Sequence, residues 1–229
     1  MKIFKYILFL VSSFSLVTCS IDDSNVVARI NNEPITNTEM NHWMLLEKAN
    51  VYSYFYRKYK VQDNPTFWTE KLGDEIPLEK LKEIALQRVK RCKVQQILAL
   101  EMGILKTANF DEILNALEEE NLNRKRKIEK GEPIYGPKQF TSRTYFFKVF
   151  DNMVIKLKNE LAKDALKPSE SQLKLLQQNV SNTNKDITGF LIMQHVDNNY
   201  DAYIDDQMNA IDIQVNKNVY NKIAVKSIM

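Results

Sequence analysis

A single long helix constrains this sequence more than any other feature. It is expected over residues 77–102, because Pro77 opens the stretch and Gly103 follows it. Proline is tolerated at the first helical position, where the N–H that it lacks would have no partner, and glycine readily takes the left-handed conformation that closes a helix. Between them, residues at steps of three and four form a stripe that further apolar residues widen: Leu78, Leu81, Ala85, Val89, Cys92, Gln96 and Ala99, with Ile84, Ile97, Leu98 and Leu100. So broad an apolar surface predicts a helix with neighbours on more than one side, the spine of a helical domain.

The composition agrees with a mostly helical protein. The 229 residues are 44% hydrophobic and 27% charged, which is enough apolar material to build a sizeable core. Five glycines and six prolines are few for a loop-rich β protein. The net charge of +3 gives no electrostatic support for nucleic-acid binding. We therefore predict a mostly α (α+β) protein with a small β element.

The first 18 residues are typical of a signal peptide. Lys2 and Lys5 precede an apolar run over residues 6–17, which is too short to cross a bilayer comfortably. The run ends in Leu16-Val17-Thr18-Cys19, which resembles a bacterial lipobox, although Gly, Ala or Ser is commoner than threonine before the cysteine. The resemblance implies lipid attachment at Cys19, a tether over residues 19–25 and an extracytoplasmic, membrane-anchored lipoprotein. An ordinary cleaved signal, or an uncleaved anchor with an incidental cysteine, is the alternative.

The mature chain divides into a helical part and a more mixed C-terminal part. Further helices are expected over residues 37–60, 110–130, 139–166, 168–178 and 200–208, and strands over residues 26–30, 187–196 and 210–216. The first of these helices has a clear start, because Thr36 and Glu39 have capping-box spacing. Its apolar stripe is expected along Leu45, Ala49, Tyr52, Tyr56 and Tyr59. In the turn before it, Asn32 is expected where a glycine would be usual.

The order of these features resembles the SurA, PpiD and PrsA type of extracytoplasmic chaperones. The segment 27–36 with Glu39 is similar to the strand, turn and helix start that open those proteins. The likeness continues through Phe67-Trp68, the 77–103 helix, Glu120-Asn121 with Arg124, and Ile134-Tyr135-Gly136-Pro137. It implies a helical chaperone-like domain over residues 26–168, completed by the C-terminal segment 169–229. It also implies that the strand Val26 to Ile30 pairs with Ile211 to Val215, as the terminal strands do in that family.

The parvulin-type isomerase module that many family members carry is missing. Only residues 179–198 separate the fifth expected helix from the C-terminal part, with His195 as their one histidine and Gly189 as their one glycine. That segment is too short for an isomerase domain and lacks its histidine pair. The resemblance therefore implies client binding without catalysis.

A chaperone of this kind needs exposed apolar and aromatic surface. The candidate client-binding residues are two aromatic groups: Tyr52, Tyr54, Phe55, Tyr56 and Tyr59, and Tyr145, Phe146, Phe147 and Phe150. Core packing is the competing explanation for each of them, and Tyr54 is the one expected to face solvent. No catalytic residue, metal ligand or cofactor site is predicted, since His42, His195, Cys19 and Cys92 lack metal-ligand spacing. Cys92 is expected as a small buried hydrophobe on the spine helix.

These observations predict a membrane-anchored, non-catalytic, foldase-like chaperone outside the cytoplasm. Its partners would be unfolded or newly exported polypeptides and the membrane that holds its anchor, with no nucleic acid. Two alternatives stay open: a peptidyl-prolyl isomerase family member with residual or no activity, and a surface lipoprotein that binds one dedicated protein. The sequence does not give the oligomeric state.

Overall fold

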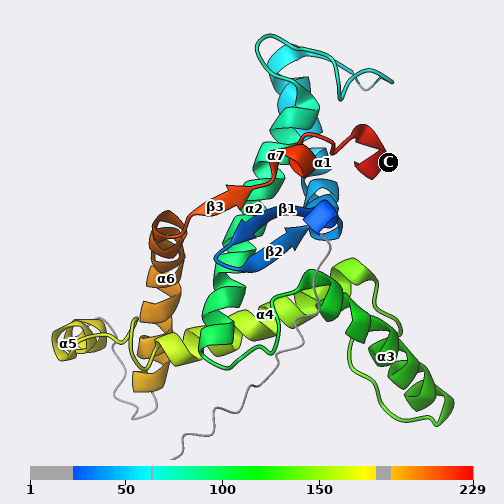
Figure 1. The fold of residues 1–229 in the computed structure, drawn as a ribbon. Helices are drawn as coiled ribbons and strands as arrows, with labels where there is room; N and C mark the ends of the chain where they lie inside the picture. Colours follow the sequence, from blue (N-terminus) through cyan, green and yellow to red (C-terminus); the bar gives the residue numbers. More distant parts are fainter. Residues whose placement is uncertain (1–22, 63, 179–186, 229) are drawn as a thin grey trace, which may run out of the picture.

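The computed structural model describes residues 23–62, 64–178 and 187–228 (Figure 1). This part of the chain is mostly helical, with one small antiparallel sheet. Its elements are the 3-10 turn η1 (Asp23–Asn25), β1 (Val26–Ile30), β2 (Glu33–Thr36), α1 (Asn37–Tyr59), α2 (Pro77–Glu101), α3 (Phe110–Glu129), α4 (Ser142–Leu161), α5 (Glu170–Gln178), α6 (Ile187–Ala210), β3 (Ile213–Val215), α7 (Lys217–Tyr220) and the 3-10 turn η2 (Val225–Ile228). The mostly α class with a small β element is thereby confirmed. The predicted signal peptide, the predicted lipid-attachment residue Cys19 and most of the predicted tether lie outside the described residues.

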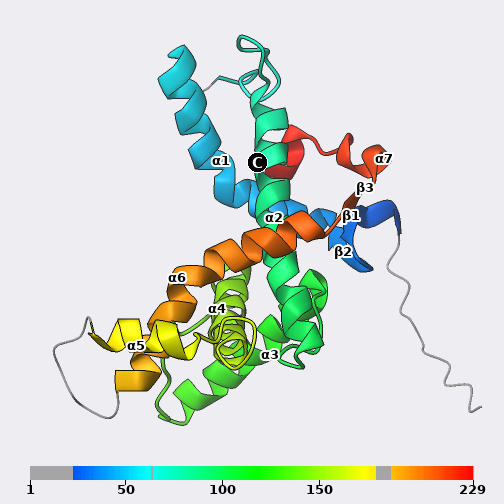
Figure 2. The ribbon, with the colours of Figure 1, turned by 90° about the vertical axis from the view of Figure 1, so that its left-hand side faces the viewer.

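Helix α2 is the spine that the sequence predicts. It begins at Pro77 and ends before Gly103, which has a φ of +68°. Its buried residues lie on several sides, because α1, α4, α6 and the sheet all pack against it. Figures 1 and 2 show α2 running through the middle of the molecule from one end to the other.

The sheet brings the two ends of the described chain together. Strand β1 lies in the centre, with β2 and β3 paired antiparallel on either side. Ala28 is paired with Val215 and Ile30 with Ile213, which confirms the predicted pairing of the N-terminal and C-terminal strands. The turn differs in detail, because Asn31 and not Asn32 takes the positive φ, at 51°. Strand β2 follows this turn directly and was not predicted.

Helix α1 starts where its cap predicts but faces the core differently. The Thr36 hydroxyl accepts a hydrogen bond from the Glu39 backbone N–H at 3.3 Å. The Glu39 carboxylate does not return to the cap; it is buried and pairs with Lys93 of α2 at 3.0 Å. The buried side of α1 consists of Met40, Trp43, Met44, Glu47, Val51 and Phe55. Within the predicted stripe, Leu45, Ala49 and Tyr56 are exposed, and Tyr52 and Tyr59 are half-buried. The periodicity did not decide which face of this helix meets the core.

The C-terminal part contains a helix where a strand was expected. Residues 187–196 open α6, which continues to Ala210 and includes the predicted short helix. Its buried residues are Leu191, Val196, Tyr200 and Ile204, and the last two pack against α2 and α4 in the smaller hydrophobic core. The Tyr200 hydroxyl also donates a hydrogen bond to the Gln95 side chain of α2 at 2.7 Å. Packing of this face outweighs the strand-like local composition of residues 187–196.

Two hydrophobic cores leave two parts of the chain projecting as arms. The larger core joins the sheet to α1, α2 and the start of α3, and a smaller one joins α2 to α4 and α6. In Figure 1 the far ends of α1 and α2 extend upward, and α3 with its returning loop extends down and away from the body. Both arms expose large apolar side chains, which is where the search for a functional surface begins.

Candidate functional site

The outer face of α1 carries an exposed apolar stripe. Leu45, Ala49, Tyr52 and Tyr56 follow at steps of four, three and four, so they share one face of the helix. Leu45 is 54% exposed and Tyr56 49% exposed, while Tyr52 is half-buried. The Tyr52 and Tyr56 rings stack with their centroids 6.4 Å apart. We call these four residues the α1 stripe.

The end of the α1 arm is held by a single carboxylate. Glu75, in the turn before α2, accepts hydrogen bonds from the hydroxyls of Tyr54 and Tyr59, each at about 3 Å, and from the Lys58 ammonium at 2.6 Å. The Lys58 hydrogen bond, helped by the two tyrosines, lowers the pKa of Glu75 to about 2. Gly73 lies close to one of these tyrosines. Its φ is +62°, and a Cβ at this position would lie only 2.9 Å from the Tyr59 ring, so a larger residue would clash. Tyr54 is thus half-buried and engaged, which corrects the expectation that it faces solvent.

The aromatic residues of α4 lie mainly inside the protein. Phe146 is 1% exposed, and its ring lies 5.1 Å from that of Phe110 and 6.0 Å from that of Phe150. Among the nine aromatic residues predicted to contact clients, Phe55, Tyr145 and Phe146 are buried, Tyr52, Tyr54, Tyr59, Phe147 and Phe150 are half-buried, and Tyr56 is exposed. The two groups do not form one surface: the α4 group packs at the junction of α1, α3 and α4. The one exposed residue among the nine, Tyr56, lies on α1.

His42 sits in this aromatic junction. Its ring centroid is 5.1 Å from that of Phe110 and 5.2 Å from that of Phe146, and its Nε2 is buried without a hydrogen-bond partner. Burial, with a smaller contribution from the Arg143 charge, lowers the pKa of His42 from 6.5 to about 4. A neutral imidazole packed among phenylalanines is a structural group, and its protonation opposes folding.

We expect the His42 environment to make the protein less stable in acid. Since the folded-state pKa lies below the unfolded value, the unfolded chain binds the proton first as the pH falls, and stability is lost between about pH 6.5 and pH 4. The loss specific to His42 should be about 1–2 kcal/mol, reduced from the full value because the side chain is partly exposed. Urea unfolding of the wild type and of His42→Phe at pH 6.5 and pH 4 gives the free energy of unfolding at each pH. The wild type should lose more of this free energy between the two pH values than His42→Phe does.

His195→Gln is the control and should behave as the wild type. Equal losses for the wild type and His42→Phe would contradict the role given to the buried His42 imidazole.

The second arm is built around a buried arginine. The Arg124 guanidinium of α3 donates to the carbonyl oxygens of Tyr135 and Pro137, at 2.9 and 2.7 Å, and pairs with Glu120 at 2.9 Å. Asn121 bonds both the N–H and the carbonyl of Phe140. These contacts fix the loop over residues 131–140 against α3.

A shallow groove runs between α3 and this loop. Its volume is about 620 Å³, and its walls include Glu118, Asn121, Leu122, Lys125, Ile128 and Lys138. Leu122 is 60% exposed, Ile128 41% and the nearby Tyr135 87%. The sequence analysis did not identify this surface. The glycines and prolines of residues 131–137 indicate a loop there, but not that the loop would fold back on α3.

Three further buried groups, Lys93, Glu39 and Cys92, have a structural explanation. Lys93, fully buried, pairs with Glu39 and donates to the carbonyl of Ala108 at 2.6 Å. Desolvation raises the pKa of Glu39, and Lys93 opposes the shift. Cys92 is buried as predicted, and burial raises the pKa of its thiol.

Among the described residues, no group of three or more His, Cys, Asp and Glu side chains is arranged to hold a metal ion. Nor does any helix within residues 23–62, 64–178 and 187–228 have the length and apolar character needed to cross a bilayer. Comparison with protein-family models, with curated proteins and with solved structures finds no match to this chain.

Proposed function

We propose that this protein is an extracytoplasmic, membrane-anchored chaperone of the SurA and PrsA type, which holds unfolded polypeptides without covalent chemistry. The observation that carries the proposal is the α1 stripe, an apolar and aromatic face turned to solvent on a projecting helix. Large apolar patches on a folded protein mark binding surfaces, because exposing them has a free-energy cost. The antiparallel pairing of β1 with β3 supports the family assignment, since the resemblance implies it.

The α1 stripe has the chemistry that a promiscuous polypeptide site requires. Leu45 offers an aliphatic contact, and the Tyr52 and Tyr56 rings offer flat surfaces with hydroxyl groups at their edges. The same helix also carries charge next to stripe residues in the sequence, at Lys48 and Arg57. Because the contacts are apolar and few, client binding would be weak and rapidly reversible.

Suppression of client aggregation tests the proposal. The chain from Ser20 to Met229 retains every described contact, and we expect it to reduce light scattering by a denatured client diluted into buffer. Replacing Leu45 and Tyr56 by serine removes about 1 kcal/mol of apolar contact at each position, so the concentration needed for half-suppression should rise about thirtyfold.

The matched control replaces two equally exposed apolar residues on other helices, Ile155→Ser and Leu175→Ser, which are 59% and 60% exposed. This pair should change the half-suppression concentration by less than about twofold. An absence of suppression by the wild type at several-fold molar excess would overturn the proposed function. An equal rise in the half-suppression concentration for both double variants would show that the α1 stripe is not the client-binding site.

A further inference from the structure

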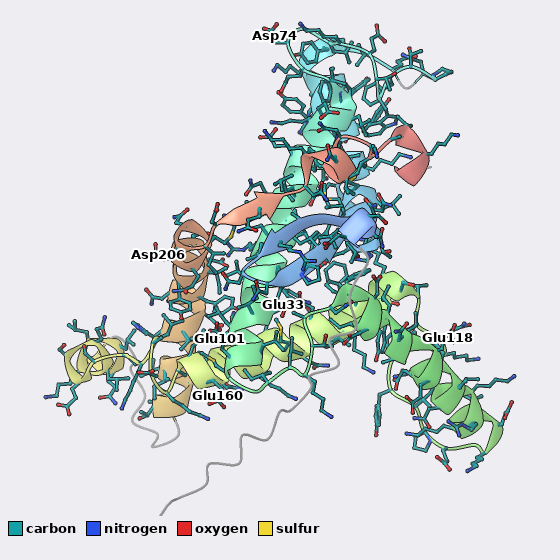
Figure 3. The ribbon with its side chains drawn as sticks, viewed as in Figure 1. Glu33, Asp74, Glu101, Glu118, Glu160 and Asp206 are labelled. Carbon is teal, nitrogen blue, oxygen red and sulfur yellow. The ribbon has the colours of Figure 1, made fainter. Side chains whose placement is uncertain are left out.

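The outer part of the α3 arm concentrates positive charge. Its exposed cations are Lys125, Arg126, Lys127, Lys130 and Lys138, and its exposed carboxylates between residues 122 and 138 are Glu129 and Glu132. Five cations against two carboxylates leave an excess of three, as large as the net charge of the whole chain. The other acidic residues of α3 lie nearer its base, and Figure 3 labels one of them, Glu118.

The helix dipole explains only part of this arrangement. Cations in the last turn of a helix are stabilised by its C-terminal carbonyl groups, which accounts for Arg126 and Lys127. The same applies to Lys130, the C-cap residue, but Lys138 lies eight positions further on in the returning loop, so the dipole does not place it. The positive surface therefore extends over both the helix and the returning loop.

Exposed apolar side chains lie beside some of these cations, since Leu122 and Ile128 line the groove together with Lys125 and Lys138. Leu122, Ile128 and Tyr135 are three of the nine large apolar residues exposed in the described part of the chain. Tyr135 is 87% exposed although its own carbonyl is bound by Arg124, so a fixed loop presents the ring to solvent. Cations combined with aliphatic and aromatic side chains are the composition of surfaces that lie in the membrane interface. Tyrosine favours the headgroup level, and lysine stems extend past it to keep their charges in water.

We infer that the outer α3 arm docks onto a bilayer surface rich in anionic phospholipid. The cations attract the headgroup phosphates, and Leu122, Ile128 and Tyr135 enter the boundary of the acyl region. Nucleic acid also offers phosphates, but Leu122 and Ile128 would gain nothing from it. This inference is independent of the α1 stripe, which lies on the other arm, and a lipid anchor at Cys19 would only bring the arm closer to the membrane.

Vesicle sedimentation tests the inference with the chain from Ser20 to Met229, which lacks Cys19. We expect binding to vesicles of one part phosphatidylglycerol to three parts phosphatidylcholine, weakened by added NaCl, and no binding to phosphatidylcholine alone. The variant Lys125→Gln, Lys127→Gln, Lys138→Gln should lower the partition coefficient by about tenfold to a hundredfold, since each cation near such a surface contributes about a fivefold factor or less. The control Lys71→Gln, Lys106→Gln, Lys174→Gln has the same charge and should lower it less than about threefold.

A probe at the loop distinguishes docking from general charge attraction. Cys92 is buried, so an environment-sensitive dye will label Tyr135→Cys or Asp74→Cys selectively. Asp74 marks the end of the other arm (Figure 3). Emission from position 135 should shift to shorter wavelength with anionic vesicles, and emission from position 74 should not. The inference would be overturned by a lack of binding to anionic vesicles, or by equal losses of binding in the two triple lysine variants. It would also be overturned by an unchanged emission at position 135, or by binding only to an acidic polypeptide or to RNA.

Discussion

Replacing Glu39 by alanine should lower the free energy of unfolding by about 3–5 kcal/mol. Glu39 and Lys93 are each 0% exposed and pair at 3.0 Å, and the other contact of the Lys93 ammonium is the Ala108 carbonyl. Removing the carboxylate leaves a positive charge buried between α1 and α2 without compensation. Chemical denaturation monitored by circular dichroism measures the loss, which is a large fraction of the stability of an ordinary domain.

Two further variants separate charge compensation from packing. The double replacement Glu39→Leu, Lys93→Met removes both charges and should recover most of the stability, because apolar residues of similar volume can replace a buried ion pair. Glu160→Ala breaks the exposed pair with Lys163 and should cost less than about 1 kcal/mol. A Glu39→Ala protein as stable as the wild type would show that Lys93 is not held by this pair.

Replacing Phe146 by alanine should also cost about 3–5 kcal/mol. Phe146 is 1% exposed and makes ring contacts with His42, Trp43, Phe110, Phe147 and Phe150. Its removal leaves a cavity where α1, α3 and α4 meet, and these helices cannot close it without losing other contacts. Thermal and urea unfolding measure the effect.

The same variant shows whether the α4 aromatic residues serve the core or a client. Ile155→Ala, at a 59% exposed position of the same helix, should change stability by less than about 0.5 kcal/mol. Below its unfolding transition, Phe146→Ala should suppress client aggregation as the wild type does. Full stability combined with lost suppression would instead place Phe146 in the client surface.

Local signals predicted most of the helices. Pro77 and Gly103 bound α2, and the Thr36 cap sets the start of α1, because each depends only on backbone chemistry within one turn. The strand pairing was also predicted, through the resemblance and the alternation at residues 210–216. Residues 187–196 were misassigned because an apolar run of that length is compatible with a strand or a helix until its neighbours are known.

The orientation of helices was harder to predict than their existence. On α1 both sides are apolar, so periodicity alone did not say whether the face of Leu45 or that of Val51 meets α2. The buried Glu39 and Lys93 lie 54 positions apart in the sequence, and only the packing of α1 against α2 makes them partners. The partners of Arg124 also depend on tertiary packing, because it reaches the carbonyl oxygens of Tyr135 and Pro137 only when residues 131–140 fold back on α3.

The α1 stripe is the surface that most of this account depends on, and site-specific photo-cross-linking tests it directly. A photo-reactive amino acid at position 56 should cross-link to an unfolded client added before illumination, and the yield should fall when the client is allowed to fold first. The same amino acid at position 155 of α4, where Ile155 is 59% exposed against 49% for Tyr56, should give little product. Equal yields at positions 56 and 155, or no product at position 56, would contradict the proposal that α1 holds unfolded polypeptides.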